Sequence, residues 1–74
     1  MTELTMLQQE PARALTRQEQ QVVKLVAEGK TDHKIANILA LKCSTVKTYL
    51  RSIRQKLQAR NRVEIVRWYY KLVH

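Results

Sequence analysis

Apolar residues recur at helical spacing along most of the chain, and the first such stretch follows a polar start signal. Thr16-Arg-Gln-Glu19 has the form of a capping box, in which the threonine hydroxyl accepts a free backbone N–H and the glutamate reaches back. The apolar positions of this stretch fall on one helical stripe: Leu15, Val22, Val23 and Val26. Gly29 is the only glycine, and glycine commonly ends a helix in the left-handed conformation. The pattern predicts a helix over 16–28.

A second, shorter pattern follows directly. Thr31 is a suitable N-cap, because its hydroxyl can accept a free N–H of the first turn. The buried face of this helix would consist of Ile35, Ala36 and Leu39. We therefore expect a helix over 31–39, followed by a tight connection over 40–43 that contains no glycine.

The third stretch has the clearest separation of apolar and polar positions. Its apolar residues are spaced by four, three and four: Val46, Leu50, Ile53 and Leu57. The opposite side carries hydrogen-bonding side chains: Ser44, Lys47, Thr48, Arg51 and Gln55. A helix over 43–58 with an aliphatic back and a front of long donors matches what reading of a DNA major groove requires.

The last helix is predicted over 61–72, where Asn61-Arg-Val-Glu64 is a second capping-box-like start. It has two apolar rows instead of one. The first row contains Val63, Val66, Tyr70 and Val73, and the second contains Ile65, Trp68, Tyr69 and Leu72. Two apolar faces imply two partners, namely the core of the domain and a second copy of the chain. The pattern leaves open which row is the dimer face, and the candidate contacts are Val63, Val66, Trp68 and Tyr70.

Composition supports one small all-α domain. The chain has 74 residues, with one glycine, one proline and no phenylalanine, which favours helices with short connections over a turn-rich β-fold. Residues 1–14 are expected to be an N-terminal tail, and 15–74 the domain. Cys43 is the only cysteine, so no disulfide forms within the chain, and this fits a reducing cytoplasm. No signal peptide and no stretch long enough to cross a membrane are visible.

Charge narrows the class of partner. The formal net charge is +8, which favours a polyanion, either nucleic acid or an anionic membrane surface. Six basic residues lie between 42 and 60, and no acidic residue does: Lys42, Lys47, Arg51, Arg54, Lys56 and Arg60. An ordinary solvated helix face is the simpler interpretation, but such faces commonly contain acidic residues for pairing. We therefore favour contact with nucleic acid.

These residues, taken in order, resemble a known family. The stretch Leu15-Thr16, Glu19, Val22-Val23, Gly29, Ile35-Ala36, Leu39, Thr45-Val46-Lys47, Ile53, Lys56-Leu57, Asn61-Arg62 is similar to the LuxR-type helix-turn-helix domain. The resemblance covers about residues 15–70. It implies four helices, of which the second and third form the helix-turn-helix and the fourth mediates dimerisation.

The resemblance also implies roles for individual residues. Lys47, Thr48 and Arg51 match positions that enter the major groove, and the planar guanidinium of Arg51 suits the O6/N7 edge of guanine. For Thr48, a contact with a thymine methyl group and plain exposure stay open alternatives. The expected phosphate contacts are Thr31, Lys34, Lys42, Ser44, Thr45 and Arg54. Arg54 and Lys56 are each either a phosphate contact or a solvated charge, and a phosphate contact also stays open for Arg51.

The chain departs from the family pattern at four positions: Gln18, Lys42, Tyr49 and Gln58. Lys42 stands where a serine commonly caps the recognition helix, so Ser44 is expected to act as the cap and to shift the helix start. Gln58 stands where the family has a glycine.

No pattern of catalytic residues, phosphate loop or metal-ligand spacing is visible, so we expect neither an enzyme nor a cofactor. His33 and His74 are too isolated in the sequence to form a ligand set with Cys43. The expected partners are double-stranded DNA and a second copy of the chain, with RNA polymerase as a further candidate and no membrane. Two alternatives stay open: a heterodimerisation partner that does not bind DNA, and the helix-turn-helix of a sigma factor. The chain is interpreted as either a stand-alone regulator or the C-terminal piece of a longer one.

Overall fold

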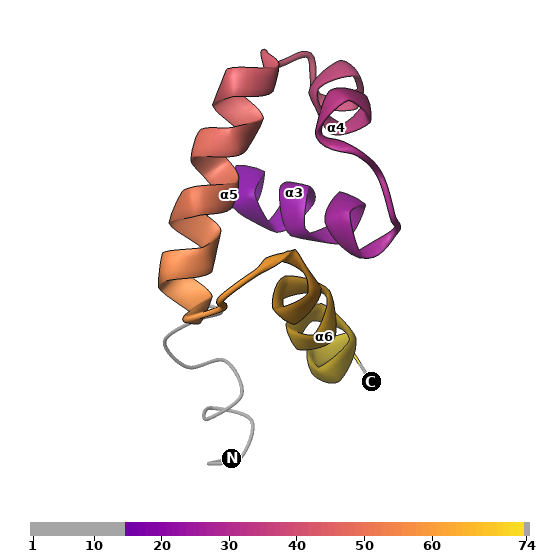
Figure 1. Ribbon diagram of the computed structural model, residues 1–74. Helices are drawn as coiled ribbons and strands as arrows, with labels where there is room; N and C mark the ends of the chain where they lie inside the picture. Colours follow the sequence, from indigo (N-terminus) through magenta and orange to yellow (C-terminus); the bar gives the residue numbers. More distant parts are fainter. Residues whose placement is uncertain (1–14, 74) are drawn as a thin grey trace.

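The computed structural model describes residues 15–73, which form four α-helices joined by short connections (Figure 1). The helices are α3 (Arg17–Ala27), α4 (Asp32–Leu39), α5 (Cys43–Leu57) and α6 (Arg62–Val73). The prediction of a four-helix, all-α domain is confirmed, and each boundary lies within one residue of the expected one. The predicted tail over 1–14 lies outside the described residues.

Polar side chains start three of these helices. In the Thr16 box, the threonine Oγ1 accepts from the Glu19 N–H at 3.1 Å, and the glutamate Oε1 accepts from the Thr16 N–H at 2.9 Å. Thr31 Oγ1 accepts from the Lys34 N–H at 3.1 Å. Asn61 Oδ1 accepts from the Glu64 N–H at 3.0 Å, whereas the Glu64 carboxylate accepts from the N–H one residue before the cap. The motif that begins α6 therefore differs from a standard capping box, because the glutamate accepts from the residue before the N-cap and not from the N-cap itself.

The start of α5 differs from the prediction. The helix begins at Cys43 with Lys42 at the N-cap position, and no side chain caps it. Ser44 lies inside the first turn, so the expectation that it replaces the family cap and shifts the helix start is wrong. The first turn of α5 also contains no acidic residue. No side chain of its own first turn therefore offsets the positive end of its helix dipole.

Two helices end without a glycine. Ala40, after α4, has φ of 58°, and Gln58, after α5, has φ of 57°, both in the left-handed region. Gly29 has φ of 86° after α3, as expected from its position. For residues with a Cβ this conformation costs about 1 kcal/mol, and the tight connections after α4 and α5 keep it nonetheless.

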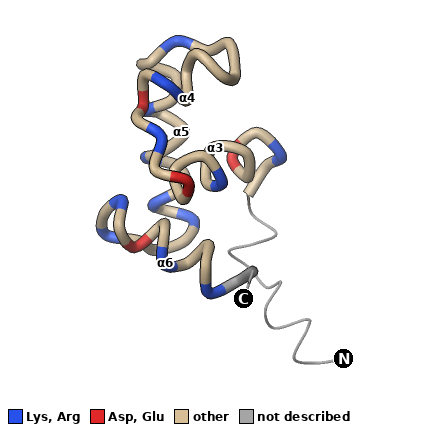
Figure 2. The backbone as a smooth tube through the Cα atoms, turned by 90° about the vertical axis from the view of Figure 1, so that its right-hand side faces the viewer, with Lys and Arg blue, Asp and Glu red and all other residues tan. Residues whose placement is uncertain are grey.

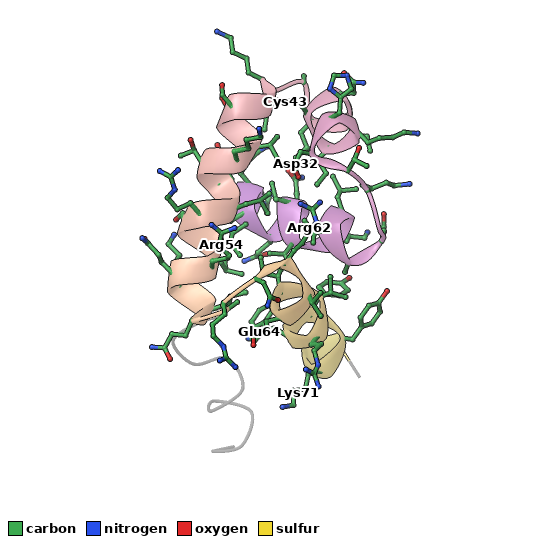
Figure 3. The ribbon with its side chains drawn as sticks, in the orientation of Figure 1. Asp32, Cys43, Arg54, Arg62, Glu64 and Lys71 are labelled. Atoms are coloured by element: carbon green, nitrogen blue, oxygen red, sulfur yellow. The ribbon has the colours of Figure 1, made fainter. Side chains whose placement is uncertain are left out.

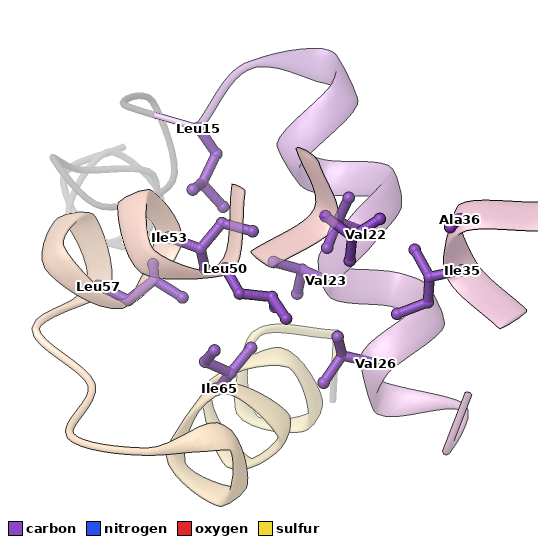
Figure 4. Close-up of a cluster of buried hydrophobic side chains, with 11 residues drawn as sticks. Leu15, Val22, Val23, Val26, Ile35, Ala36, Leu50, Ile53, Leu57 and Ile65 are labelled. Carbon is purple, nitrogen blue, oxygen red and sulfur yellow. The ribbon is translucent and has the colours of Figure 1, made fainter. Parts of the chain in front are cut away.

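The core joins one face of each helix (Figure 4). Val22, Val23 and Val26 of α3 meet Ile35 of α4, and Ile65 of α6 closes the cluster from the other side. The four apolar positions predicted for the third helix are all buried: Val46, Leu50, Ile53 and Leu57. The structure thus confirms that α5 has a fully apolar back, which leaves its opposite face for solvent or a partner.

The structure assigns the two apolar rows of α6. Ile65 is fully buried, and Trp68, Tyr69 and Val66 are half-buried against the same core. Val63 is 63% exposed and Tyr70 is 44% exposed. Ile65, Trp68 and Tyr69 of one row therefore serve the core. In the other row Val63 and Tyr70 face outward, whereas Val66 also packs against the core.

Candidate nucleic-acid interface

Helices α4 and α5 are joined by a short turn, and α5 forms one long edge of the molecule (Figure 1). Helix α3 crosses behind the middle of α5 and packs against it, so the apolar back of α5 is held in place. The outward face of α5 carries the side chains that the sequence predicted there, and all of them are exposed: Ser44, Lys47, Thr48, Arg51 and Gln55. This face is polar, unobstructed and supported from behind by the core.

The three candidate base contacts lie together on this face. Lys47 and Arg51 are one helical turn apart, and both are exposed. Thr48 lies between them, and its hydroxyl donates to the Ser44 carbonyl at 3.1 Å. Among the described residues, neither Lys47 nor Arg51 forms an ion pair.

The candidate phosphate contacts border the same face. Lys42 and Ser44 are exposed at the start of α5, where Thr45 is half-buried, and Arg54 is half-buried two turns further on. Thr31 and Lys34 lie at the start of α4, where the hydroxyl of Thr31 serves as the helix cap. A shallow depression joins the starts of α4 and α5, and its lining includes Thr31, His33, Cys43 and Lys47. The structure therefore brings Thr31 of α4 and Lys47 of α5 to the same depression.

The basic run from Lys42 to Arg60 is not uniform, and charge alone does not locate the interface. Lys and Arg are spread along the chain and greatly outnumber Asp and Glu (Figure 2). Lys56 Nζ lies 2.7 Å from Glu19 Oε1, and Arg60 Nη2 lies 3.3 Å from Glu64 Oε2. Lys56 is thus ion-paired within the protein, an arrangement that neither sequence-based alternative for it included. Its acidic partner comes from another helix, 37 residues away.

Glu19 is the centre of this second arrangement. It is 3% exposed and accepts hydrogen bonds from Ser52 Oγ at 2.9 Å and Lys56 Nζ at 2.7 Å, in addition to the Thr16 N–H. Burial raises the pKa of the Glu19 carboxyl, but these hydrogen bonds and the charge of Lys56 outweigh burial and hold its pKa below the ordinary value of 4.5. The sequence indicated only the capping role of Glu19. The structure shows that it also ties α3 to α5.

Arg62 is a residue whose contacts the sequence did not predict. Its Nη1 donates to Asp32 Oδ1 at 2.6 Å, and its Nη2 donates to the Lys30 carbonyl at 2.7 Å (Figure 3). These bonds fasten the start of α6 to the loop that precedes α4. Arg62 therefore positions the Thr31 end of the candidate interface, a role that only the resemblance of Asn61-Arg62 to the family pattern marked as notable.

The sequence did not predict a contact between His33 and Cys43, but the structure shows one. His33 Nδ1 lies 3.4 Å from Cys43 Sγ, where α4 and α5 come together. No group of three or more His, Cys, Asp or Glu side chains within residues 15–73 is arranged to hold a metal ion. The pair is therefore a contact between the two helices of the turn.

The candidate dimer contacts lie on α6, away from the outward face of α5. A groove beside α6 has a mixed lining. Its apolar and aromatic residues are Leu57, Ala59, Val66, Trp68 and Tyr70, and its polar residues are Gln58, Glu64, Arg67 and Lys71. Tyr70 is anchored from its outer end, because its hydroxyl donates to the Ala27 carbonyl at 3.0 Å. Val63 and Tyr70 are the most exposed of the four predicted contacts, and Trp68 also packs against the core.

Two packed helices joined by a tight turn, the second with a buried apolar back and an exposed polar front, define a helix-turn-helix domain. The comparisons with known proteins agree. The family model of the luxR family of bacterial regulatory proteins matches residues 13–69. The chain belongs to this family, and its described part has the four-helix domain of the LuxR type.

The chain is similar to several transcription regulators. It is 42% identical over 55 residues to the transcriptional regulatory protein DesR of Bacillus subtilis, covering 74% of this chain and 28% of that protein. It is 44% identical over 52 residues to the monoamine regulon transcriptional regulator of Klebsiella aerogenes, covering 70% of this chain and 23% of that protein. It is 37% identical over 54 residues to LiaR of Bacillus subtilis, covering 73% and 26%.

The chain thus spans about a quarter of the length of these relatives. No solved structure matches it significantly. None of the helices over residues 15–73 is long and apolar enough to span a membrane.

Proposed function

We propose that this domain binds specific sequences of double-stranded DNA, with α5 in the major groove, and that it regulates transcription as a homodimer in the cytoplasm. The observation that carries the proposal is the outward face of α5. Lys47 and Arg51 are exposed there and form no ion pair with any of residues 15–73, and the opposite face of the same helix is buried. A major groove about 12 Å wide admits a helix, and exposed long donors on that helix reach base edges.

The bordering residues suit contacts with the DNA backbone. Lys34, Lys42 and Arg54 supply positive charge on either side of the candidate base contacts, and Thr31, Ser44 and Thr45 supply hydroxyl groups. The start of α5 adds backbone N–H groups and the positive end of a helix dipole, and the first turn of α5 contains no acidic residue. Asp32, which lines the same depression, is paired with Arg62. Contacts of this kind fix the register of the protein on the duplex, and the base contacts then select the sequence.

The outward row of α6 suits pairing of two copies. Val63 and Tyr70 are exposed on α6. Tyr70 also lines the groove beside α6, together with Val66 and Trp68. Burial of this row in a two-fold dimer would remove apolar surface from water and leave both copies of α5 exposed. Two-fold symmetry would place the recognition helices on half-sites about 34 Å apart.

The test is a binding titration on random-sequence duplex DNA at low and moderate salt, followed by selection and sequencing of the bound duplexes. We expect binding that weakens steeply with salt, and a selected site with two-fold symmetry. The double variant Lys47→Ala with Arg51→Ala should lose this binding and keep its thermal unfolding midpoint. Lys24→Ala is the matched control, because Lys24 is an exposed cation on α3. A folded wild-type protein that fails to bind at low salt would refute the proposal.

The second candidate function is that of a heterodimerisation partner without DNA binding, favoured by the same exposed α6 row. Native mass spectrometry of the protein alone and with a full-length regulator of its family separates the two. Heterodimers formed by a chain without DNA affinity would support this alternative, and homodimers that bind DNA would exclude it.

A further inference from the structure

Thr48 differs in its hydrogen bonding from the two cations that share the outward face of α5 with it, Lys47 and Arg51. Its hydroxyl donates to the Ser44 carbonyl one turn earlier, at 3.1 Å, while the side chain as a whole is exposed. Lys47 and Arg51 carry only donors, and neither is engaged in an ion pair within the described residues. Within the candidate reading face, Thr48 is therefore chemically unlike the two cations.

A threonine hydroxyl has a single proton, and here that proton is committed to the helix backbone. Threonine in a helix often adopts a rotamer that allows this bond to the carbonyl of residue i−4. The Cβ is tetrahedral, so the methyl group occupies a separate branch that the bond does not hold against the carbonyl. The side chain thus presents a methyl group and an oxygen that can accept but not donate.

This chemistry discriminates among the base edges of the major groove. Guanine presents two acceptors there, N7 and O6, and Thr48 has no proton left to give them. Thymine presents a C5 methyl group, with which the threonine methyl can make an apolar contact. Lys47 and Arg51 can meanwhile donate to acceptors on the neighbouring base pairs.

We propose that Thr48 is a specificity-determining residue that selects thymine through its C5 methyl group. This inference rests on the proposed function, and it adds to it the chemistry of one base position in each half-site. Its rival is that the free oxygen of Thr48 accepts from the amino group of adenine or cytosine, which is a separate outcome of the same test.

The test replaces thymines of the selected duplex by deoxyuridine, one symmetric pair at a time, which removes only the methyl group. We expect one pair whose replacement weakens wild-type binding about fourfold per half-site. Burial of one such carbon group contributes about 0.8 kcal/mol, and 1.4 kcal/mol is a factor of ten.

Two variants make the test specific to the Thr48 methyl. Thr48→Val keeps a methyl on each branch and removes the hydroxyl, so it should remain sensitive to deoxyuridine at this pair. Thr48→Ser keeps the hydroxyl and removes the methyl, so it should bind thymine and deoxyuridine duplexes equally. Both variants are checked for unchanged helix content and unfolding midpoint.

The outcomes separate the inference from the function on which it rests. If the protein binds DNA but no thymine pair is sensitive, or if Thr48→Ser stays as sensitive as the wild type, the inference is refuted and the proposed function stands. The wild type and Thr48→Ser keep the hydroxyl oxygen, and Thr48→Val lacks it. If the first two prefer adenine or cytosine at one position and Thr48→Val does not, the oxygen contacts the base and the inference is also refuted. A protein that binds no DNA refutes both.

Discussion

The two ends of α5 carry similar charges and use them differently. At the N-terminal end, Lys42 and Lys47 are exposed, and neither forms an ion pair within residues 15–73. At the C-terminal end, Lys56 is bound to buried Glu19, and Arg60, just beyond the helix, is bound to Glu64. A run of basic residues in a sequence therefore does not define one surface. Acidic side chains supplied by other helices decide which cations serve the fold and which stay available to a polyanion.

The largest expected effect concerns the C-terminal end of α5, where Lys56 is paired with Glu19. Glu19→Ala removes the acceptor of three hydrogen bonds that join α3 to its own cap and to α5. We expect the free energy of unfolding to fall by about 2–3 kcal/mol, because hydrogen bonds to a charged group are stronger than neutral ones and their partners are left unpaired. Urea denaturation followed by circular dichroism measures this. The control is Glu28→Ala, which removes an exposed carboxylate at the C-cap of α3. Its free energy of unfolding should equal that of the wild type.

The next effect concerns the N-terminal part of α5, whose cations form no ion pair within residues 15–73. Arg51→Ala and Lys47→Ala should each weaken binding to the selected duplex by about tenfold or more, since loss of a base contact costs about 1–3 kcal/mol. Neither should change the unfolding midpoint. The comparison variant is Lys56→Met, which keeps much of the aliphatic stem but removes the charge next to Glu19. We expect the opposite result for it, a lower midpoint with nearly unchanged DNA affinity, measured below its unfolding transition. If Lys56→Met lost as much DNA affinity as Arg51→Ala and Lys47→Ala, the two ends of α5 would not differ in their role in DNA binding.

A smaller effect separates positioning contacts from reading contacts. Lys42→Gln and Arg54→Gln should weaken binding to all duplexes by a similar factor. Each should reduce the slope of log affinity against log salt by about one, because each phosphate contact releases condensed counterions. Fluorescence anisotropy titrations at four salt concentrations measure the slope. A change in the selected sequence, with the slope unchanged, would instead mark either residue as a base contact.

The smallest expected effect is on the dependence of stability on pH. The pKa of Glu19 is lower in the folded protein than its ordinary value of 4.5, so its contribution is fully present above that value. It is lost as the pH falls through the lower, folded-state pKa. The free energy of unfolding should therefore decline below about pH 5, and Glu19→Gln should make the decline shallower. Glu64, whose pKa is also lowered, chiefly by the Arg60 N–H, adds a decline of the same sign that remains in this variant.

The local part of the fold could be predicted from the sequence. Thr16, Thr31 and Asn61 act within three residues of themselves, and the apolar stripe of α5 is a property of its own periodicity, so the helices were found to within one residue. The prediction that Ser44 caps α5 was wrong. It assumed that α5 needs a side-chain cap as in the family, but α5 begins after Lys42 without one.

Contacts between distant residues could not be predicted in this way. Glu19 meets Lys56 across 37 residues, and Arg62 meets Asp32 across 30, because the packing of whole helices brings them together. No periodicity encodes such a meeting. The same packing decided which row of α6 is buried. The candidate base contacts at Lys47 and Arg51 came from the exposed face of one helix and from the family resemblance, and their role stays a prediction.

The most direct test of the distinction between the two ends is lysine footprinting. The protein is treated with an acetylating reagent with and without the selected duplex, and the rate of modification at each lysine is read by mass spectrometry. We predict that the duplex protects Lys42, Lys47 and Lys34, leaves Lys24 at its free rate, and scarcely changes Lys56, whose amino group is held by Glu19 in both states. Protection of Lys24, with Lys42 and Lys47 reacting as in the free protein, would contradict the account.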